Sequence, residues 1–427
     1  MNSKSLLISL LVAGMSMGTA WAIRGQFGHE QGAAWAGSIG ALSVLLVAKR
    51  ADWYSRVFKA TLAAAAGWGI GGIMSYGIVV GYGRGVDFVN VYYGLVMLFI
   101  IGGLYGFIGG GLFGLALADS SRKRVLWPQL IVEMFVGAVV VYFFLIEEWG
   151  WLMTPPRSEM WAACLGMAFA LTWFIYRTEQ YSALRVAVFA GLGAGFGFAF
   201  GNFLQVMGGV STFKFNFWNV MEYSIGFFGG AGMAYGTFTS RWEPAEDPQK
   251  RRSQWFPLLT LTLVIPFIVW EQTFERKRLE EIYTKITAGD VTALAQTIQW
   301  VALAALLIAG ISWFMLYYRT KRTEFVSYDY SDVRTFFIGH FSLYAAFSFL
   351  ITGAFMSGYR PEQYLYLVNL GFVTLLIGNA KPRFSNRGLY GSRLAMGFAL
   401  LLVFIALLTL VAINLHGEMK GMNRRFE

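Results

Sequence analysis

The sequence predicts an all-α integral membrane protein, and both its composition and its apolar runs support this fold class. Hydrophobic residues make up 56% of the 427 residues, whereas charged residues make up only 14%. Water-soluble domains usually contain about a quarter charged residues. Apolar runs of about twenty residues, long enough to cross a bilayer as a helix, recur along the chain. We therefore expect a polytopic helix bundle surrounded by lipid.

The apolar runs define thirteen predicted membrane spans. Their approximate ranges are 5–23, 33–48, 58–82, 91–117, 128–146, 159–176, 184–206, 219–239, 255–271, 293–317, 333–357, 363–380 and 392–415. If the N-terminus is inside, 22 of the 34 lysines and arginines fall in cytoplasmic segments, and the short outer loops are poor in positive charge. The positive-inside rule then predicts a protein of the cytoplasmic (inner) membrane with its C-terminus outside.

The first predicted span shares features with a secretory signal peptide. Lys4 precedes an apolar run that ends in an A-x-A pattern at 20–22. Gly14 and Gly18, however, have the GxxxG spacing of a packed transmembrane helix. We expect this segment to remain attached as an uncleaved span.

Glycine usage divides the chain into two predicted parts. Residues 1–240 contain 38 of the 50 glycines, and a polar, proline-containing linker follows. The prediction is a Gly-rich bundle of about eight spans over 1–240 and a bundle of about five spans over 255–427. A charged stretch near 272–288 has Leu279 and Ile282 on one helical face, which predicts a helix lying on the outer surface. Asp290 is positioned to cap the helix that follows.

Three segments of the N-terminal part share an apolar–polar–apolar pattern and are interpreted as related helical hairpins. They centre on 21–37, 67–117 and 191–235, and each contains or adjoins a GxxxG pair. Small residues four positions apart allow two helix backbones to approach closely in lipid. We interpret these glycines as packing residues rather than as a nucleotide-binding loop.

Polar residues of the predicted outer loops and adjacent helix ends form the candidate solute site. Arginine suits a carboxylate or phosphate group because its guanidinium offers a bidentate fork. The predicted binding residues are Arg24, His29, Glu30, Arg84, Asp87, Asn202, Gln205, Asn219 and Glu222. The alternative is that they are solvated loop residues, with Arg24 and Glu30 pairing to hold the first loop.

Glu133 and His340 are ionisable residues within predicted spans. Such residues usually face a cavity or a partner, because a charge in lipid is costly. They are candidates for a proton relay, and hydrogen-bonded helix interfaces are the alternative interpretation.

The sequence predicts neither a metal site nor a cofactor, and it assigns no catalytic residue. His29-Glu30 lacks the second histidine of an HExxH motif, because residue 33 is alanine, and Cys164 is the single cysteine. The net charge of +10 comes from loops between spans, so topology explains it better than nucleic-acid binding.

The leading functional hypothesis is a transporter or channel for a small polar or anionic solute, which binds in an outer vestibule between the hairpins. One alternative is an integral membrane enzyme that acts on a lipid-linked or periplasmic substrate through His29 and Glu30, together with Arg24 or Arg84. Another is a structural subunit of a membrane complex. The expected partners are the lipid bilayer and a small solute, with a homo-oligomer or a membrane-complex partner as a further option.

Overall fold

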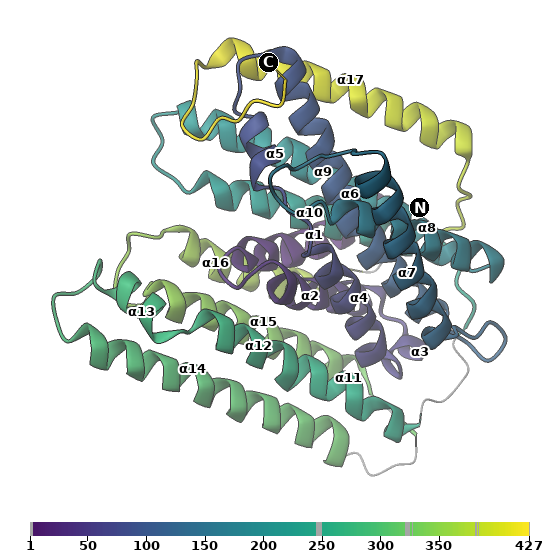
Figure 1. The fold of residues 1–427 in the computed structure, drawn as a ribbon. Coiled ribbons are helices and arrows are strands. Elements are labelled where there is room, and N and C mark those ends of the chain that lie inside the picture. The colour runs from purple at the N-terminus through teal and green to yellow at the C-terminus, as the bar shows by residue number, and fades with distance from the viewer. Residues whose placement is uncertain are drawn as a thin grey trace.

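Apolar residues surround most helices of this protein instead of forming a single stripe, a property of helices buried in lipid or in other helices. The computed structural model describes residues 3–244, 250–320, 325–326, 328–380, 382 and 384–426. This part of the chain is helical and contains no β-strand beyond an isolated bridge between Lys250 and Phe325 (Figure 1). Nine of its helices are long and apolar enough to cross a membrane. These features indicate a multi-pass membrane protein.

The nine long apolar helical stretches are α1 (Ser3–Arg24), α2 (Glu30–Ala48), α6 (Phe88–Ala118), α7 with η1 (Trp127–Tyr142 and Phe143–Glu148), α9 (Tyr181–Val210), α11 to α12 (Trp255–Leu259, η3 Thr260–Val264 and Ile265–Thr273), α14 with η4 (Val291–Phe314 and Met315–Thr320), α15 (Tyr330–Thr352) and α17 (Gly391–Leu415). The other described helices are α3 (Ala51–Tyr54), α4 (Val57–Gly71), α5 (Gly77–Tyr82), α8 (Trp161–Arg177), α10 (Phe217–Phe238), η2 (Arg251–Gln254), α13 (Arg276–Tyr283) and α16 (Glu362–Leu376). Four predicted spans fall on α4–α5, α8, α10 and α16, which are shorter or less apolar than the nine.

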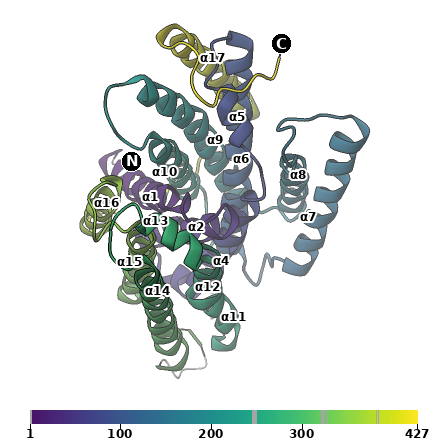
Figure 2. The ribbon, with the colours of Figure 1, turned by 60° about the vertical axis from the view of Figure 1, so that its left-hand side comes forward.

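Six helices of the N-terminal half form a closed ring. In chain order, α1 contacts α2, α2 contacts α4, α4 contacts α6, α6 contacts α9, α9 contacts α10, and α10 returns to α1. We call this arrangement the six-helix ring; its members occupy the middle of the molecule in Figure 2. Glycines allow this close packing: a Cβ atom at Gly67 would overlap the backbone of Gly109, and one at Gly195 would overlap the carbonyl of Phe99.

The remaining helices surround the six-helix ring. α7 packs on α8, which rests against α6 and α9 (Figure 2). α12 and α15 contact α2, α16 contacts α1, and α17 contacts α6 and α9. In α13, the side chains of Leu279 and Tyr283 are buried while Arg276 and Lys277 are exposed, so the charged side of this short helix faces outward.

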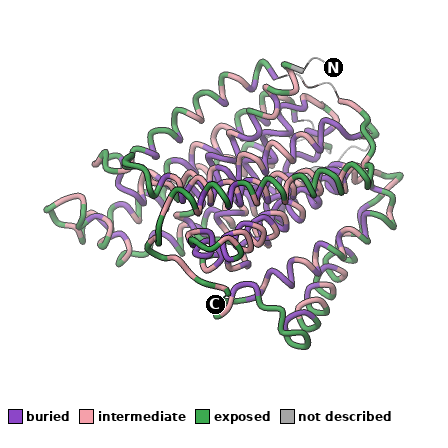
Figure 3. The backbone as a smooth tube through the Cα atoms, turned by 90° about the horizontal axis from the view of Figure 1, so that it is seen from above, coloured by how far each residue is buried: buried purple, intermediate pink, exposed green. Residues whose placement is uncertain are grey.

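Burial follows this arrangement. In the most apolar window of α2, 89% of the residues are buried, whereas the value is 22% for α14 and for α17. Figure 3 shows the buried residues at the centre and the exposed residues along the outer helices. Many exposed residues of the outer helices are large and apolar, such as Ile308 and Leu400. Such surfaces are suited to contact with lipid tails.

The predicted span at 58–82 is not one helix, so the expectation of a continuous span is wrong there. α4 ends at Gly71, residues 72–76 are non-helical, and α5 begins at Gly77. The backbone of Glu30 packs directly against Gly72, where a side chain would overlap it. The break directs Tyr76 toward the end of α1, where it contacts Arg24.

Basic segments that the sequence assigns to the cytoplasm lie together at one end of the bundle. Lys49 Nζ donates to the Gly378 carbonyl at 2.6 Å, and Arg185 Nη1 donates to the Gly388 carbonyl at 3.1 Å. Lys123 forms an ion pair with Glu179 at 3.6 Å. Parts of the prediction lie outside the described residues, namely 245–249 of the linker and the basic residues Lys321, Arg322, Lys381 and Arg383.

Candidate functional site

Arg24 is the last residue of α1, and the chain turns immediately after it. The Phe27 amide donates to the Arg24 carbonyl at 2.8 Å, and Gly28 has a φ of 91°, which favours glycine. This turn leaves the guanidinium inside the bundle, where Arg24 is 1% exposed. A buried cation of this kind requires a counter-charge and several hydrogen-bond acceptors.

The counter-charge comes from Glu222 on α10. Arg24 Nη2 donates to Glu222 Oε2 at 2.5 Å and to Tyr76 Oη at 2.9 Å. Tyr76 Oη in turn donates to Glu222 Oε1 at 3.2 Å. The carboxylate therefore accepts hydrogen bonds on both oxygens, which satisfies its charge in a poorly solvated place.

His29 completes this group, which we call the Arg24 cluster: Arg24, His29, Tyr76 and Glu222. Arg24 Nη1 lies 3.2 Å from His29 Nδ1. Because a guanidinium only donates, Nδ1 must accept, and the ring is neutral in this arrangement. Partial burial and the neighbouring Arg24 charge both lower the pKa of His29 from its ordinary value of 6.5. One edge of His29 remains exposed to solvent.

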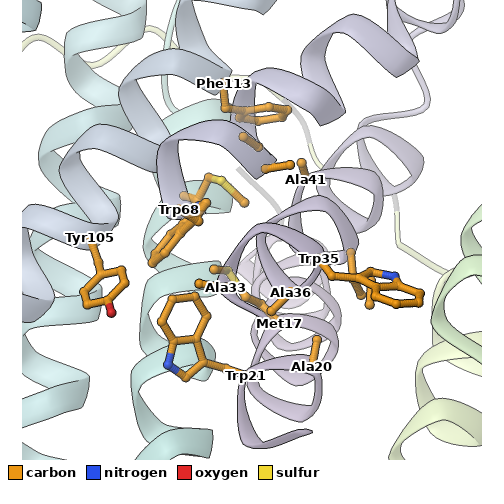
Figure 4. Close-up of a cluster of buried hydrophobic side chains, with 14 of the residues drawn as sticks. Met17, Ala20, Trp21, Ala33, Trp35, Ala36, Ala41, Trp68, Tyr105 and Phe113 are labelled. Carbon is orange, nitrogen blue, oxygen red and sulfur yellow. The ribbon is translucent and has the colours of Figure 1, made fainter. Parts of the chain in front are cut away.

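Aromatic side chains fill the six-helix ring beside the Arg24 cluster. Trp21 lies one turn before Arg24, and its ring lies 4.9 Å from the guanidinium carbon. Trp21 contacts Trp68 and Tyr105 edge-on, with ring centroids 5.1 Å and 5.4 Å apart. Figure 4 shows Trp21 and Trp68 next to each other, with Tyr105 to the left of both.

Trp68 reaches across the ring from α4. An added Cβ would overlap its side chain at Gly37 of α2, at Gly109 of α6 or at Gly229 of α10. Glycines at these positions therefore make room for one large side chain at the centre. The interior is filled by aromatic groups, so it is closed in this conformation.

Four buried donors in this region have no hydrogen-bond partner among the described residues. They are Arg24 Nε, Trp21 Nε1, Trp68 Nε1 and Tyr105 Oη. Each buried polar group without a partner costs about 1–3 kcal/mol. Indole and guanidinium N–H groups only donate, so the set is suited to an acceptor-rich molecule such as an anion. Unpartnered indole nitrogens also occur at Trp35 and Trp53, but those rings belong to other aromatic clusters.

Asn202 and Gln205 form a second polar pair on α9. Asn202 Nδ2 donates to Gln205 Oε1 at 3.2 Å, while Asn202 Oδ1 and Gln205 Nε2 are buried without a partner in the described structure. Phe198, one turn before Asn202, contacts Tyr76 with ring centroids 5.0 Å apart. This pair therefore adjoins the Arg24 cluster.

The structure places the remaining predicted site residues elsewhere. Glu30 is exposed at the start of α2, and Arg24 pairs with Glu222 instead, so the alternative pairing of Arg24 with Glu30 is not formed. Asp87 caps α6 by accepting from the Asn90 amide at 2.9 Å.

Arg84 packs on the Trp218 ring, with 5.1 Å from its guanidinium carbon to the ring centroid, and its Nη1 donates to the Lys420 carbonyl at 3.4 Å. Partial burial lowers its pKa from the ordinary value. Asn219 has a buried Nδ2 without a partner in the described part of the chain. Neither residue has a contact with the Arg24 cluster among the described interactions.

Glu133 and His340 lie apart from each other and from the cluster. Glu133 accepts from Arg177 at 2.7 Å and from Gln129 at 2.8 Å. His340 is 1% exposed, lies 2.9 Å from Ser38 Oγ and stacks on Phe336. These contacts resemble helix-interface interactions more than steps of a connected relay.

Sequence reasoning missed Tyr76, Trp21, Trp68 and Tyr105. An aromatic residue in an apolar run has the same pattern whether it packs on lipid or lines a site, so no local signal separates them. The helix break at 72–76 begins at the second of two consecutive glycines, Gly71 and Gly72, which was the one available indication for Tyr76.

Within the described residues, no group of three or more His, Cys, Asp or Glu side chains is arranged to hold a metal ion. Comparisons of the chain with protein-family models, with curated proteins and with solved structures gave no match.

Proposed function

We propose that this protein is a transporter or channel of the cytoplasmic membrane for a small polar or anionic solute. The observation that carries the proposal is that Trp21, Trp68 and Tyr105, whose polar atoms have no partner among the described residues, pack beside the buried Arg24–Glu222 ion pair. The solute site consists of the Arg24 cluster with Trp21, Trp68 and Tyr105. Asn202 and Gln205 lie on its outer approach.

The energetics of the buried polar groups support a ligand role. Ionisable side chains within membrane bundles usually mark solute or ion pathways. A buried ion pair contributes little net stability, because desolvation offsets the attraction between the charges. The four unpartnered donors add a further cost. A bound solute with several acceptor atoms would satisfy these donors, and an anion is favoured because three of the four groups can only donate.

The break between α4 and α5 supports the same proposal. Non-helical backbone at membrane depth is tolerated only where it is buried in protein or lines a cavity. Transporters commonly form substrate sites at discontinuous helices of this kind. Here the break provides Tyr76, which contacts both charged members of the ion pair.

In the proposed cycle, the present conformation is the closed state. The Arg24–Glu222 pair closes one end of the six-helix ring, and aromatic side chains fill its interior. An entering anion competes with Glu222 for the guanidinium of Arg24. Separation of the pair then loosens α10 from α1 and opens a path past Trp21.

The proposal also includes the number and the orientation of the membrane spans. Thirteen spans cross the membrane, with the N-terminus inside and the C-terminus outside. The three Gly-rich hairpins follow one another around the six-helix ring, and the Arg24 cluster lies toward the outer side. The clustering of basic loop segments at the opposite end supports this orientation.

Solute binding to the purified protein tests the proposal. Thermal stabilisation by a panel of small inorganic anions and carboxylates would identify a ligand, and uptake into proteoliposomes would then establish transport. We expect Arg24→Ala to weaken binding of the identified anion by roughly tenfold or more, corresponding to about 1.5–3 kcal/mol for a lost charged hydrogen bond. Arg276→Ala is the matched control, because Arg276 is half exposed in a surface ion pair. If both variants take up the anion as well as the unmodified protein does, Arg24 is not part of the site.

A second candidate function is an integral membrane enzyme, and His29 is the observation that favours it. Its neutral ring is partly exposed and is oriented by Arg24, as a general base would require. His29→Gln distinguishes the two functions. In a transporter this variant should only weaken solute binding, so that uptake recovers at saturating solute, whereas an enzyme that uses His29 as its base would lose turnover even at saturating substrate.

A further inference from the structure

A second polar site lies at the opposite end of the six-helix ring. A cleft of about 740 Å³ opens where α6, α9 and α10 meet the loop at 386–389. Its described lining includes five basic residues and two acidic ones, namely Arg56, Lys123, Arg185, Arg241 and Arg387, with Glu179 and Glu243. The cleft is therefore positively charged, and it lies far along the ring helices from Arg24.

Arg185 is a buried cation of this cleft that has no acidic partner in the described structure. It is 5% exposed, and its Nε and Nη2 donate to Thr239 Oγ1 at 3.0 Å and 2.9 Å. Its Nη1 donates to the Gly388 carbonyl at 3.1 Å. These neutral acceptors fix the guanidinium without neutralising it. A buried, uncompensated cation attracts an anion into the cleft.

Two further residues indicate that the cleft is incomplete without a ligand. Gln180 is 3% exposed, and its Oε1 is buried without a partner in the described residues. Arg241 is exposed at the rim and forms no ion pair with any described residue. Together with Arg185 they present polar groups both in the buried part of the cleft and at its rim.

An apolar groove adjoins the cleft on the outer surface of the ring. It has a volume of about 340 Å³ and is lined by residues of α6, α8 and α9, including Phe107, Phe169 and Leu192. On α9, Leu184 lines the cleft and Val188 lines the groove; on α8, Tyr176 lines the cleft and Thr172 lines the groove. Each pair is separated by one helical turn, which is about 5.4 Å. The polar cleft thus continues into an apolar channel along the same two helices.

We propose that this cleft and groove bind one anionic phospholipid. The phosphate lies among Arg185, Arg241 and Arg387, and an acyl chain follows the groove between α6, α8 and α9. Basic pockets between transmembrane helices on the cytoplasmic side are suited to anionic head groups. Tyr176 and Trp242 also line the cleft, and such aromatic residues favour the membrane–water interface. A soluble phosphate would use the cleft but would leave the apolar groove empty.

The lipid site is separate from the Arg24 cluster, so the two proposals fail independently. The bound lipid would join α8 to the ends of α6, α9 and α10, which surround the cleft. Because the lipid binds only the folded chain, its occupancy stabilises the protein by mass action.

Thermal unfolding of the full-length protein in a non-ionic detergent tests this proposal. The probes are dioleoyl phosphatidylglycerol, dioleoyl phosphatidylcholine, glycerol 3-phosphate and inorganic phosphate. We expect phosphatidylglycerol to raise the melting temperature by several degrees, and the other three to have little effect. Equal stabilisation by the two lipids would overturn the proposal. Equal stabilisation by glycerol 3-phosphate would also overturn it and would assign the cleft to a soluble anion.

Two sets of variants locate the effect. Arg241→Gln combined with Arg387→Gln removes exposed cations at the rim, and it should weaken the apparent affinity for phosphatidylglycerol at least tenfold. The matched control is Arg276→Gln combined with Arg424→Gln, which removes two exposed arginines elsewhere. Val188→Phe should narrow the groove and also weaken binding. If the rim variant and the control bind the lipid equally, the cleft is not the site.

Discussion

The guanidinium of Arg24 and the carboxylate of Glu222 lie 2.5 Å apart, although 198 positions separate them in the sequence. Both side chains are almost fully enclosed, with exposed fractions of 1% and 7%. An isolated ion is costly to bury, so each charge depends on the other. The pair therefore joins α1 to α10 and holds one end of the six-helix ring together.

A double-mutant cycle should reveal this dependence. Arg24→Met or Glu222→Gln alone should lower the free energy of unfolding by about 3–5 kcal/mol, because each leaves a buried group without its partner. The combined variant should lose clearly less than the sum. The measurement is reversible unfolding in detergent. The exposed pair Arg424–Glu418, with exposed fractions of 64% and 63%, is the control and should give a coupling energy below about 1 kcal/mol. Additive losses at Arg24 and Glu222 would contradict the interpretation.

Tyr105→Phe should weaken solute binding without lowering the stability of the protein. The Tyr105 hydroxyl has no partner among the described residues, so its removal should leave the melting temperature unchanged or slightly higher. Binding of the transported anion should weaken about tenfold, since one donor of the site is lost. Tyr344→Phe is the matched control: its hydroxyl donates to the Gly32 carbonyl at 3.0 Å, so this variant should lose stability instead. Unchanged binding in Tyr105→Phe would place the hydroxyl outside the site.

Stability should depend on pH through His29. Its pKa is lower in the folded protein than the ordinary value of 6.5, so the unfolded chain binds the proton more readily. The contribution of neutral His29 to the free energy of unfolding is therefore fully present above about pH 6.5, and it is lost as the pH falls toward the folded-state pKa. Melting temperatures measured from pH 7.5 to 5 should fall less steeply in His29→Gln than in the unmodified protein. Parallel curves for the two proteins would show that His29 does not titrate in this range.

Two glycine substitutions should have effects of opposite sign. Gly109→Ala should destabilise the protein by about 1–3 kcal/mol, because the new methyl group would overlap Trp68 in a filled interior. Gly371→Ala lies in α16, where an added Cβ meets nothing within 4 Å. It should stabilise by about 0.5–1 kcal/mol through the lower backbone entropy of alanine. Thermal unfolding of both variants provides the comparison, and equal effects would argue against packing as the role of Gly109.

The orientation of the helices can be tested with reporter fusions at Lys123, Arg251 and Lys321. All three should report the cytoplasm if the N-terminus is inside. Lys321 lies outside the described residues, so the first two provide the structural comparison. Periplasmic signals at two of these positions would reverse the proposed topology.

Local patterns in the sequence predicted local structure well. Apolar runs predicted helices because such a run is read from consecutive residues and requires no knowledge of contacts between distant parts of the chain. Asp290 was expected to cap a helix, and its side chain does accept from the Ala293 amide at 3.0 Å. The GxxxG glycines were expected to pack, and Gly14 and Gly18 do lie directly against α10.

Which residues come together at the Arg24 cluster depends on contacts between distant positions, and local sequence patterns carry no information about such contacts. Arg24 and Glu222 were both candidates, but the sequence did not indicate that they pair; the alternative interpretation paired Arg24 with Glu30, which is near in sequence. The actual partner is set by the closure of the six-helix ring. The run at 58–82 also concealed a break, since the backbone of Glu30, which is distant in sequence, packs against Gly72 at this point.

The six-helix ring follows chain order and closes only where α10 meets α1, and this order has a consequence for biosynthesis. Chains grow at about 5–20 residues per second, so roughly 10–40 s separate the synthesis of Arg24 from that of Glu222. During that interval the nascent chain carries an uncompensated cation at the end of its first helix. Arrival of α10 is therefore the event that neutralises Arg24. A chain that stalls before residue 222 would present this charge, together with a half-assembled set of Gly-rich helix faces, to the quality-control proteases of the membrane.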